Sequence, residues 1–312
     1  EADDIFISAG AKEDAAALEQ LFPLGARIAV TDPVYPVYAD ASAMAGRLGS
    51  FRNGRWEKLV YLPCEEHNGF EPPLPMEPVD VIFLCFPNNP TGAVLSYEAL
   101  QRFVDFARQH RALIVFDAAY RAFVTDPKVP RSIYQVPGAA EVAIECCSFS
   151  KFAGFTGVRC GWTVVPRALR GLDDRGNTHS VQELWRRLLQ STRNGVSYAV
   201  QCAARAVFDP QGQQECRAAA AYYLQNASVL LEEMRMAGLT AYGGVNAPYV
   251  WARTPQHMDS WTLFEFLLDH ARVAVTPGAG FGPGGEGYFR LSAFNTPENI
   301  REACRRIRAA LR

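Results

Sequence analysis

The sequence of 312 residues has few lysines, little net charge and no long apolar run. No apolar run approaches the ~20 residues of a membrane-spanning helix, which excludes a membrane channel. The formal net charge is −2, so no overall positive field attracts nucleic acid or an anionic membrane. These absences favour a small-molecule partner, with neither nucleic acid nor membrane as a target.

The chain also lacks the spacings that are typical of metal sites and disulfide frameworks. None of the eight cysteines forms a Cys-x-x-Cys pair, and several lie in apolar runs. This pattern predicts reduced, buried thiols in a reducing compartment. The five histidines are scattered and form no pair at helical spacing, so no metal site is predicted.

Apolar runs alternate with helical patterns over the first two thirds of the chain. Because these runs are continuously apolar, they predict an α/β fold with a mainly parallel sheet between layers of helices. After about residue 196 longer helical patterns dominate. We therefore expect a large domain over residues 1–196 and a smaller α+β domain over 197–312. The predicted strands cover residues 27–30, 79–84, 112–117, 142–147 and 161–165, and the predicted later helices cover 214–237 and begin near 259–260 and 296–298.

A glycine pattern near the C-terminus matches a dinucleotide-binding motif by its letters alone. Gly280, Gly282 and Gly285 have the Gly-x-Gly-x-x-Gly spacing, but residues 288–292 after them read as a strand. The dinucleotide motif requires a helix at this point, to receive the pyrophosphate. The pattern therefore predicts a connection between two strands.

Lysine is scarce enough for each one to be considered separately. Only four of the 31 basic residues are lysines, and Lys58 and Lys128 lie in segments typical of solvated surface. Lys151 differs, because it directly follows a predicted buried strand. A lysine at its ordinary pKa of about 10.4 needs roughly 4.6 kcal/mol to present a free amine at pH 7. Desolvation or a neighbouring cation lowers that cost, and a Schiff base with a carbonyl cofactor avoids most of it.

The residues around Lys151 suit a phosphate. Ser148 and Ser150 precede it and Arg159 follows, which offers two hydroxyl donors and a bidentate guanidinium. An ordinary structural loop is the alternative interpretation of this stretch.

Three other segments place polar residues where α/β proteins bind ligands. Residues 8–12 lead into a helix whose N-terminus suits an anion, although an ordinary turn fits as well. Asn89 follows a predicted strand, at the carboxyl edge of the sheet. Asp117 ends another strand, with Tyr120 three residues on; a helix cap is the alternative role of this carboxylate.

The order and spacing of these residues resemble the fold-type I pyridoxal-phosphate (PLP) aminotransferases and, within them, the LL-diaminopimelate aminotransferase family. The resemblance covers essentially the whole chain and is carried by residues 10–12, 32–36, 88–92, 148–151, 153–159, 246–251 and 280–287. It implies amino-group exchange between glutamate and tetrahydrodipicolinate to give LL-2,6-diaminopimelate, in lysine biosynthesis. It also implies small amino-acid and oxo-acid substrates, a homodimer, and a location in the cytoplasm or, in a photosynthetic eukaryote, the chloroplast.

The resemblance assigns cofactor roles residue by residue. Lys151 would bond covalently to PLP and move the substrate proton, and Asp117 would keep the ring nitrogen protonated. Asn89 and Tyr120 would hydrogen-bond the phenolic oxygen of PLP. The predicted catalytic residues are Lys151, Asp117 and Tyr120. The full predicted cofactor set is Ala11, Lys12, Tyr35, Asn89, Asp117, Tyr120, Ser148, Ser150, Lys151 and Arg159, with Tyr35 stacked on the ring.

The resemblance also assigns the substrate residues. Arg290 would bind the substrate α-carboxylate with help from Asn194, and Lys12 would lie within reach of the distal end. The full predicted substrate set is Lys12, Tyr35, Asn89, Asn194 and Arg290.

The chain departs from this family at its start. Family members carry a further stretch before the segment that matches Glu1, which includes an arm over the substrate and a tyrosine that reaches the phosphate of the partner subunit. We therefore expect the chain to be N-terminally incomplete relative to them, and residues 5–7 to form a strand. Alternatives are a PLP aminotransferase or lyase with another amino-acid substrate, an inactive truncated fragment, and the sensor half of a transcription regulator, for which the sequence shows no basic recognition helix.

Overall fold

The computed structural model describes residues 1–173 and 175–311, and its largest element is a seven-stranded sheet. Only β9 runs against its neighbours, since it pairs antiparallel with β1 and β8 while the other pairs are parallel. The prediction of a mainly parallel sheet is confirmed. In spatial order the strands are β1 (Ile5–Ser8), β9 (Gly161–Val164), β8 (Ala143–Ser148), β7 (Leu113–Asp117), β6 (Val81–Cys85), β2 (Ile28–Asp32) and β5 (Val60–Pro63).

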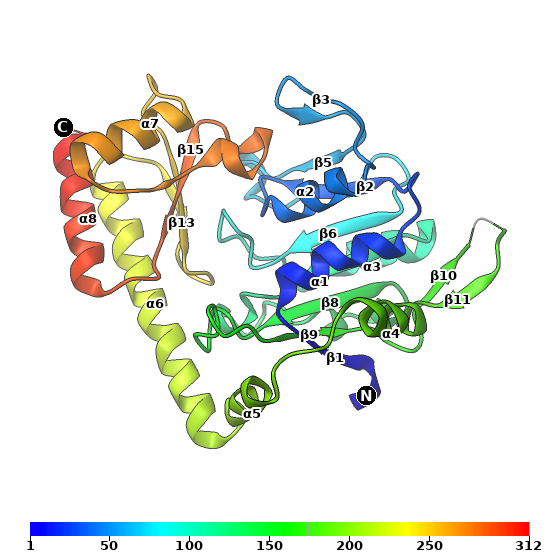
Figure 1. The fold of residues 1–312 in the computed structure, drawn as a ribbon. Coiled ribbons are helices and arrows are strands. Elements are labelled where there is room, and N and C mark those ends of the chain that lie inside the picture. Colours follow the sequence, from blue (N-terminus) through cyan, green and yellow to red (C-terminus); the bar gives the residue numbers. More distant parts are fainter. Residues whose placement is uncertain (174, 312) are drawn as a thin grey trace.

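Helices cover both faces of this sheet, which explains its continuously apolar strands (Figure 1). In β6 the side chains of Val81, Phe83 and Cys85 pack into one core, and those of Ile82 and Leu84 pack into the other. The first core includes residues of α1 (Ala11–Leu18), α2 (Val37–Met44) and α4 (Val181–Thr192), and the second includes the apolar face of α3 (Tyr97–His110). Alternation along one strand therefore supplies two separate layers of packing.

Side-chain caps fix where several helices begin. Ser96 accepts a hydrogen bond from the Ala99 amide (3.0 Å) at the start of α3. Thr296 accepts from the Asn299 amide (3.3 Å) at the start of α8 (Pro297–Ala310), with Pro297 in the first turn. The long helix α6 runs over Pro210–Met236 and starts four residues before its predicted first residue. That difference lies in the first turn, where Pro210 is also favourable.

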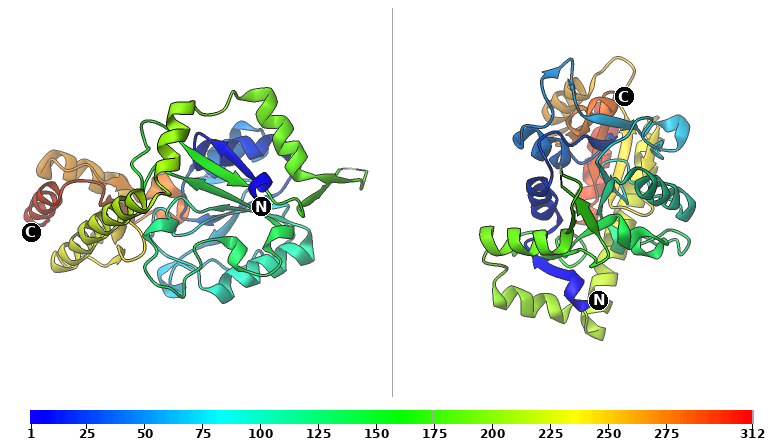
Figure 2. Two further views of the ribbon diagram at one scale, coloured as in Figure 1. Left: turned by 90° about the horizontal axis from the view of Figure 1, so that it is seen from below. Right: turned by 90° about the vertical axis from the view of Figure 1, so that its right-hand side faces the viewer.

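A smaller antiparallel sheet follows α6 and lies beside the large one (Figures 1 and 2). Its core is shared with α6, α7 (Ser260–Phe266) and α8. The division into domains at residue 196 stays a prediction. In spatial order the strands of the small sheet are β12 (Ala241–Gly243), β13 (Tyr249–Arg253), β15 (Tyr288–Ser292) and β14 (Thr276–Pro277). Other elements are α5 (Tyr198–Ala206), a π-helical turn at Leu267–Ala271 after α7, several short 3-10 helices, and the antiparallel pairs β3 (Phe51–Arg52) with β4 (Arg55–Trp56) and β10 (Arg170–Leu172) with β11 (Thr178–Ser180).

The glycine-rich segment connects β14 to β15, as predicted, and it touches the large sheet. Asp32, at the end of β2, accepts a hydrogen bond from the Gly284 amide (2.8 Å). A Cβ atom on Gly282 or Gly284 would lie 2.6 or 2.9 Å from the Asp32 carboxylate, closer than carbon and oxygen approach. These glycines therefore allow close contact between the two sheets.

All eight cysteines are free thiols, of which six are buried as predicted, whereas Cys202 is exposed and Cys216 is half-buried. The reducing compartment stays a prediction. Among residues 1–173 and 175–311, no helix is both long enough and apolar enough to cross a membrane. The same residues contain no group of three or more His, Cys, Asp or Glu that could hold a metal ion.

Candidate active site

The predicted site residues gather at one edge of the large sheet. The neighbouring parallel strands β8, β7, β6 and β2 end at this edge. Lys151, Asn89 and Tyr35 follow β8, β6 and β2, and Asp117 is the last residue of β7. Parallel strands direct all the loops at their carboxyl ends to the same side, where ligands of α/β proteins bind. The topology thus brings together residues that are far apart in the sequence.

Lys151 is a partly buried amine in a positively charged surrounding. Burial lowers its pKa, and the charges of Arg290, Lys12 and Arg159 lower it further. Its ammonium group lies 5.2 Å from the centre of the Phe294 ring. The two aids that a reactive lysine needs, desolvation and neighbouring cations, are both present.

Asp117 is a buried carboxylate, 4% exposed, whose partners are both neutral. It accepts hydrogen bonds from the Tyr38 hydroxyl (2.7 Å) and the Ala119 amide (3.0 Å). Burial raises its pKa. Among the ion pairs of the described residues, none involves Asp117, so a ligand that presents a positive N–H group would match this carboxylate.

Hydroxyl groups and a guanidinium form an anion cradle next to Lys151. Arg159 donates to the Ser150 hydroxyl (2.9 Å), and Ser150 contacts the Ser148 hydroxyl (2.9 Å). Gly10 caps α1 on the other side, and a Cβ atom there would lie 2.8 Å from Arg159 Nη2 and 3.3 Å from Ser148 Oγ. This arrangement suits a phosphate, because a helix N-terminus, two hydroxyls and a guanidinium all donate hydrogen bonds. The first two residues of α1 are the predicted phosphate contacts Ala11 and Lys12.

Gly161 allows this cradle to close, which leads to a prediction. A Cβ atom on Gly161 would lie 2.4 Å from the Cys147 carbonyl oxygen and 2.6 Å from Gly10 Cα. We expect Gly161→Ala to lower the free energy of unfolding by about 2 kcal/mol and to weaken PLP binding about tenfold, since β9 must move away from β8 and from Gly10. Urea unfolding and titration of the apoprotein with PLP measure the two effects.

Gly157→Ala is the matched control, because nothing lies within 4 Å of the added methyl group. Equal stability and equal PLP affinity for the two variants would show that the close approach at Gly161 is unimportant.

Asp14 holds the backbone beside the cradle through hydrogen bonds, and the sequence motifs did not predict this role. Its carboxylate is buried, accepts hydrogen bonds from Ser8 and from Thr163 (2.6 Å), and lies 3.3 Å from an Arg193 nitrogen. The Ser8 hydroxyl in turn accepts from the Gly10 amide (3.2 Å). The sequence offers one signal for this contact, which is that Ser8 lies six positions before Asp14, an acid on an alanine-rich helix.

The buried Asp14 predicts a specific pH dependence of stability. Burial raises its pKa from 3.8 to about 6 despite its hydrogen bonds. The folded state therefore holds a proton more tightly than the unfolded state, and this contribution to stability is lost as the pH rises from about 4 to 6. Asp14→Asn removes the titration. Between pH 4 and pH 7 we expect the unfolding free energy of the wild type to fall by about 2 kcal/mol relative to the variant. Parallel urea titrations measure the difference, and parallel pH curves for the two proteins would contradict the prediction.

Arg290 brings the small sheet into the site. It lies on β15, donates to Asn89 Oδ1 (2.6 Å) and to Thr276 Oγ1 (3.3 Å), and stacks over the Tyr249 ring at 4.4 Å. Among residues 1–173 and 175–311, its buried Nε has no hydrogen-bond partner. Arg290 and Asn89 were predicted to share the site, and this contact joins them directly.

The other predicted residues lie at the margins of the site or make unexpected contacts. Lys12 Nζ lies 5.8 Å from the centre of the Tyr35 ring. Tyr120 is buried and hydrogen-bonds the Tyr249 hydroxyl (2.9 Å). Asn194 is exposed, and none of the hydrogen bonds of the described residues joins it to Arg290, so its role stays a prediction.

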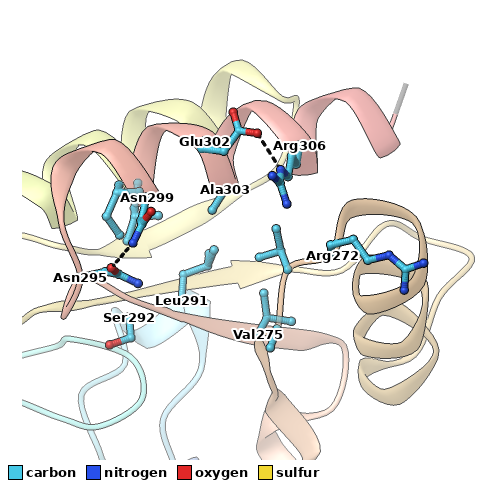
Figure 3. A pocket seen from close by; sticks show the side chains of 13 residues that line it. Arg272, Val275, Leu291, Ser292, Asn295, Asn299, Glu302, Ala303 and Arg306 are labelled. Carbon is cyan, nitrogen blue, oxygen red and sulfur yellow. Dashed lines mark hydrogen bonds and ion pairs between the residues drawn. The ribbon is translucent and has the colours of Figure 1, made fainter.

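A cavity of about 330 Å³ lies elsewhere, between α8, β15 and residues 272–275 (Figure 3). It contains none of the predicted site residues, and the Arg306 side chain at its rim is paired with Glu302 (2.7 Å).

The fold and the site define an α/β protein that presents a lysine with a lowered pKa, a buried acid and an anion cradle at one sheet edge. The family described as aminotransferase class I and II matches residues 1–307, so the chain belongs to this family and is a transaminase. Members of the family depend on PLP.

Individual relatives show which members of this family the chain resembles. The LL-diaminopimelate aminotransferase of Lawsonia intracellularis is 50% identical over 311 residues, which cover 100% of this chain and 76% of the relative. That of Prochlorococcus marinus is 52% identical over 309 residues, with 99% and 76% covered. The solved structure of L,L-diaminopimelate aminotransferase from Chlamydomonas reinhardtii is 43% identical, with a TM-score of 0.95 over 100% of this chain and 76% of that one. The resemblance stated from the sequence is confirmed.

Proposed function

We propose that this transaminase uses PLP to exchange an amino group between LL-2,6-diaminopimelate and 2-oxoglutarate, which yields tetrahydrodipicolinate and glutamate, in lysine biosynthesis. The observation that carries the proposal is the distribution of charge at the sheet edge. Arg290, Lys12 and Arg159 all lie close enough to Lys151 to lower its pKa, while the buried Asp117 has only neutral hydrogen-bond partners. This set matches a ligand that carries a phosphate and a carboxylate at one side and a protonated ring nitrogen at the other. The names of the relatives support the choice of substrate.

The chain's residues fit PLP at each of its polar groups. Ser148, Ser150, Arg159 and the amides of Ala11 and Lys12 would hold the phosphate, and Asp117 the ring nitrogen. Tyr35 would cover the ring, and Asn89 and Tyr120 would donate to the phenolic oxygen. When bound, PLP supplies an electron-accepting ring that stabilises negative charge at the substrate Cα atom.

The chain itself binds the substrate and moves the proton. Arg290 would hold the α-carboxylate, with its guanidinium plane already fixed by Asn89 and Thr276. Lys151 Nζ would take the proton from Cα, because burial and neighbouring cations keep its pKa below the ordinary value. Asp117 would remain ionised beside the positive ring nitrogen and so keep that nitrogen protonated. Lys12 and Asn194 are proposed as further substrate contacts.

The quaternary structure and location belong to the same proposal. We propose a homodimer that works in the cytoplasm, or in the chloroplast of a photosynthetic eukaryote. The eight free thiols support a reducing compartment.

The deciding experiment measures glutamate-dependent amination of tetrahydrodipicolinate by the PLP-loaded protein, beside a panel of other oxo acids. We expect kcat/KM for tetrahydrodipicolinate to exceed that for the other acceptors by at least about 100-fold. A preference for another oxo acid would contradict the proposed substrate. Consumption of an amino acid with no acceptor present would indicate a lyase, and PLP binding without turnover would indicate an inactive fragment.

A further inference from the structure

Tyr249 lies where the two sheets meet, and no catalytic or binding role was predicted for it. It is the first residue of β13 and is 3% exposed. Its hydroxyl lies 2.9 Å from the Tyr120 hydroxyl, and its ring lies 4.4 Å from the centre of the Arg290 guanidinium. One side chain thus touches both a proposed cofactor contact and the proposed substrate-carboxylate contact.

We infer that Tyr249 is a positioning residue that orients the Tyr120 hydroxyl through a hydrogen bond and the Arg290 guanidinium through its ring face. This inference rests on the proposed function, because it concerns how two residues of that site are held.

The backbone of Tyr249 is fixed by close contacts with glycines. Its carbonyl oxygen accepts from the Gly244 amide (2.8 Å). A Cβ atom on Gly243 would lie 2.6 Å from that oxygen, and one on Gly92 would lie 3.2 Å from it and 2.9 Å from Gly243 Cα, so side chains do not fit here without a shift of the backbone. Gly92 follows Asn89 in the loop after β6, which means that the Tyr249 backbone packs against the large sheet's own site loop. The position of the ring is therefore set by the same contacts that hold the two sheets together.

Either tyrosine oxygen can donate this hydrogen bond when no ligand is bound. Burial raises the pKa of both tyrosines, so both are protonated at neutral pH. The Arg290 charge opposes this rise at Tyr249, whereas the pKa of Tyr120 lies well above its ordinary value. A Tyr120 hydroxyl that donates its single proton to a ligand oxygen can only accept from Tyr249, so Tyr249 is the donor once the ligand is bound. Accepting this hydrogen bond strengthens the donation from Tyr120 to the ligand.

The ring of Tyr249 acts on Arg290 in a separate way. Arg290 lies between the faces of Tyr249 and Phe281, at 4.4 and 4.9 Å. Asn89 and Thr276 bind its two terminal nitrogens from the side. Stacking and these two bonds together fix the plane of the guanidinium, and a bidentate carboxylate contact requires that plane.

Tyr249→Phe and Tyr249→Leu separate the two effects. Phenylalanine keeps the ring and removes the hydroxyl. In the PLP-loaded Phe variant we expect the pH midpoint of the visible absorption band to rise by about half a unit to one unit, because a weaker Tyr120 hydrogen bond stabilises the deprotonated chromophore less. The KM for the amino-acid substrate should stay within about twofold while kcat falls. The Leu variant loses the ring as well, and its KM should rise about tenfold.

The controls test specificity and folding. Tyr222→Phe removes a hydroxyl from an exposed tyrosine and should leave the midpoint unchanged. Tyr120→Phe should shift the midpoint at least as far as Tyr249→Phe, and the double variant should show no additional shift, because both act through one hydrogen bond. Urea unfolding of the apoproteins shows whether each variant folds. If Tyr249→Leu does not fold, Tyr249→Met takes its place, because methionine retains more of the side-chain volume.

An unchanged midpoint in Tyr249→Phe would overturn the role of the hydroxyl, and an unchanged KM in the folded Leu or Met variant would overturn the role of the ring. The midpoint requires only bound PLP, so it remains informative if diaminopimelate is not the substrate. A wild-type protein with no visible band in the presence of PLP would instead contradict the proposed function.

Discussion

In a Lys151→Ala variant we expect the visible absorption band of the PLP-loaded protein to disappear and kcat to fall by about 10⁴-fold. Lys151 is the only lysine of the four placed directly after a strand of the large sheet at the site edge, and its pKa is lowered by burial and by Arg290, Lys12 and Arg159. Alanine removes both the amine that bonds PLP and the proton acceptor. Absorption spectra before and after PLP addition, together with the amination assay, measure the two losses.

Lys128→Ala is the matched control, because Lys128 is exposed. It should keep the band and full activity. If Lys151→Ala kept an unchanged band, the amine that carries PLP would have to be a different one, and the assignment of the site would be wrong.

An Asp117→Asn variant should be more stable than the wild type as apoprotein and much less active when loaded. The wild-type carboxylate is buried with neutral partners only, and its raised pKa reflects the cost of holding a charge there. Asparagine is neutral and can still hydrogen-bond Tyr38 and the Ala119 amide. At pH 7.5 we expect the apoprotein to gain about 2 kcal/mol of unfolding free energy. We expect kcat to fall by about 10²- to 10³-fold, because the amide does not keep the ring nitrogen protonated.

Urea unfolding with and without PLP measures both sides of this prediction. PLP should stabilise the wild type by more than it stabilises Asp117→Asn, since it supplies the missing positive partner only for a carboxylate. Asp269→Asn changes an exposed acid in the same way and should alter neither property. A less stable Asp117→Asn apoprotein would show that the carboxylate is already compensated in the folded chain.

The large sheet could be predicted because its strands are buried on both faces. Each predicted strand lies within two residues of the observed one; for example, residues 112–117 became Leu113–Asp117. Local patterns do not determine the order β1-β9-β8-β7-β6-β2-β5 or the reversed direction of β9, because both depend on contacts between distant segments. The hairpins at β3–β4 and β10–β11 have strands of two or three residues, too short for a pattern.

The site could be predicted where a motif carried it and not where only folding creates a contact. Lys151, Ser148, Ser150 and Arg159 lie within twelve residues, and their cradle was expected. Tyr38 is 79 residues from Asp117, and Tyr249 is 129 residues from Tyr120. The Tyr38 hydroxyl reaches Asp117 only when helix α2 packs on the large sheet. The Tyr249 hydroxyl reaches Tyr120 only when β13 meets the loop after β7.

The position of Arg290 on the small sheet has a consequence for how the substrate is held and released. Lys151 and Asp117 are carried by the large sheet, whereas the carboxylate contact depends on β13, β14 and β15 and on the Asp32–Gly284 hydrogen bond (2.8 Å) that joins the sheets. Local opening of the C-terminal elements would therefore release the substrate while the large-sheet residues around Lys151 and Asp117 stay in place. Substitutions in α6, α7 or α8 that favour this opening should then raise KM for every amino-acid substrate, because each one carries the α-carboxylate that Arg290 binds.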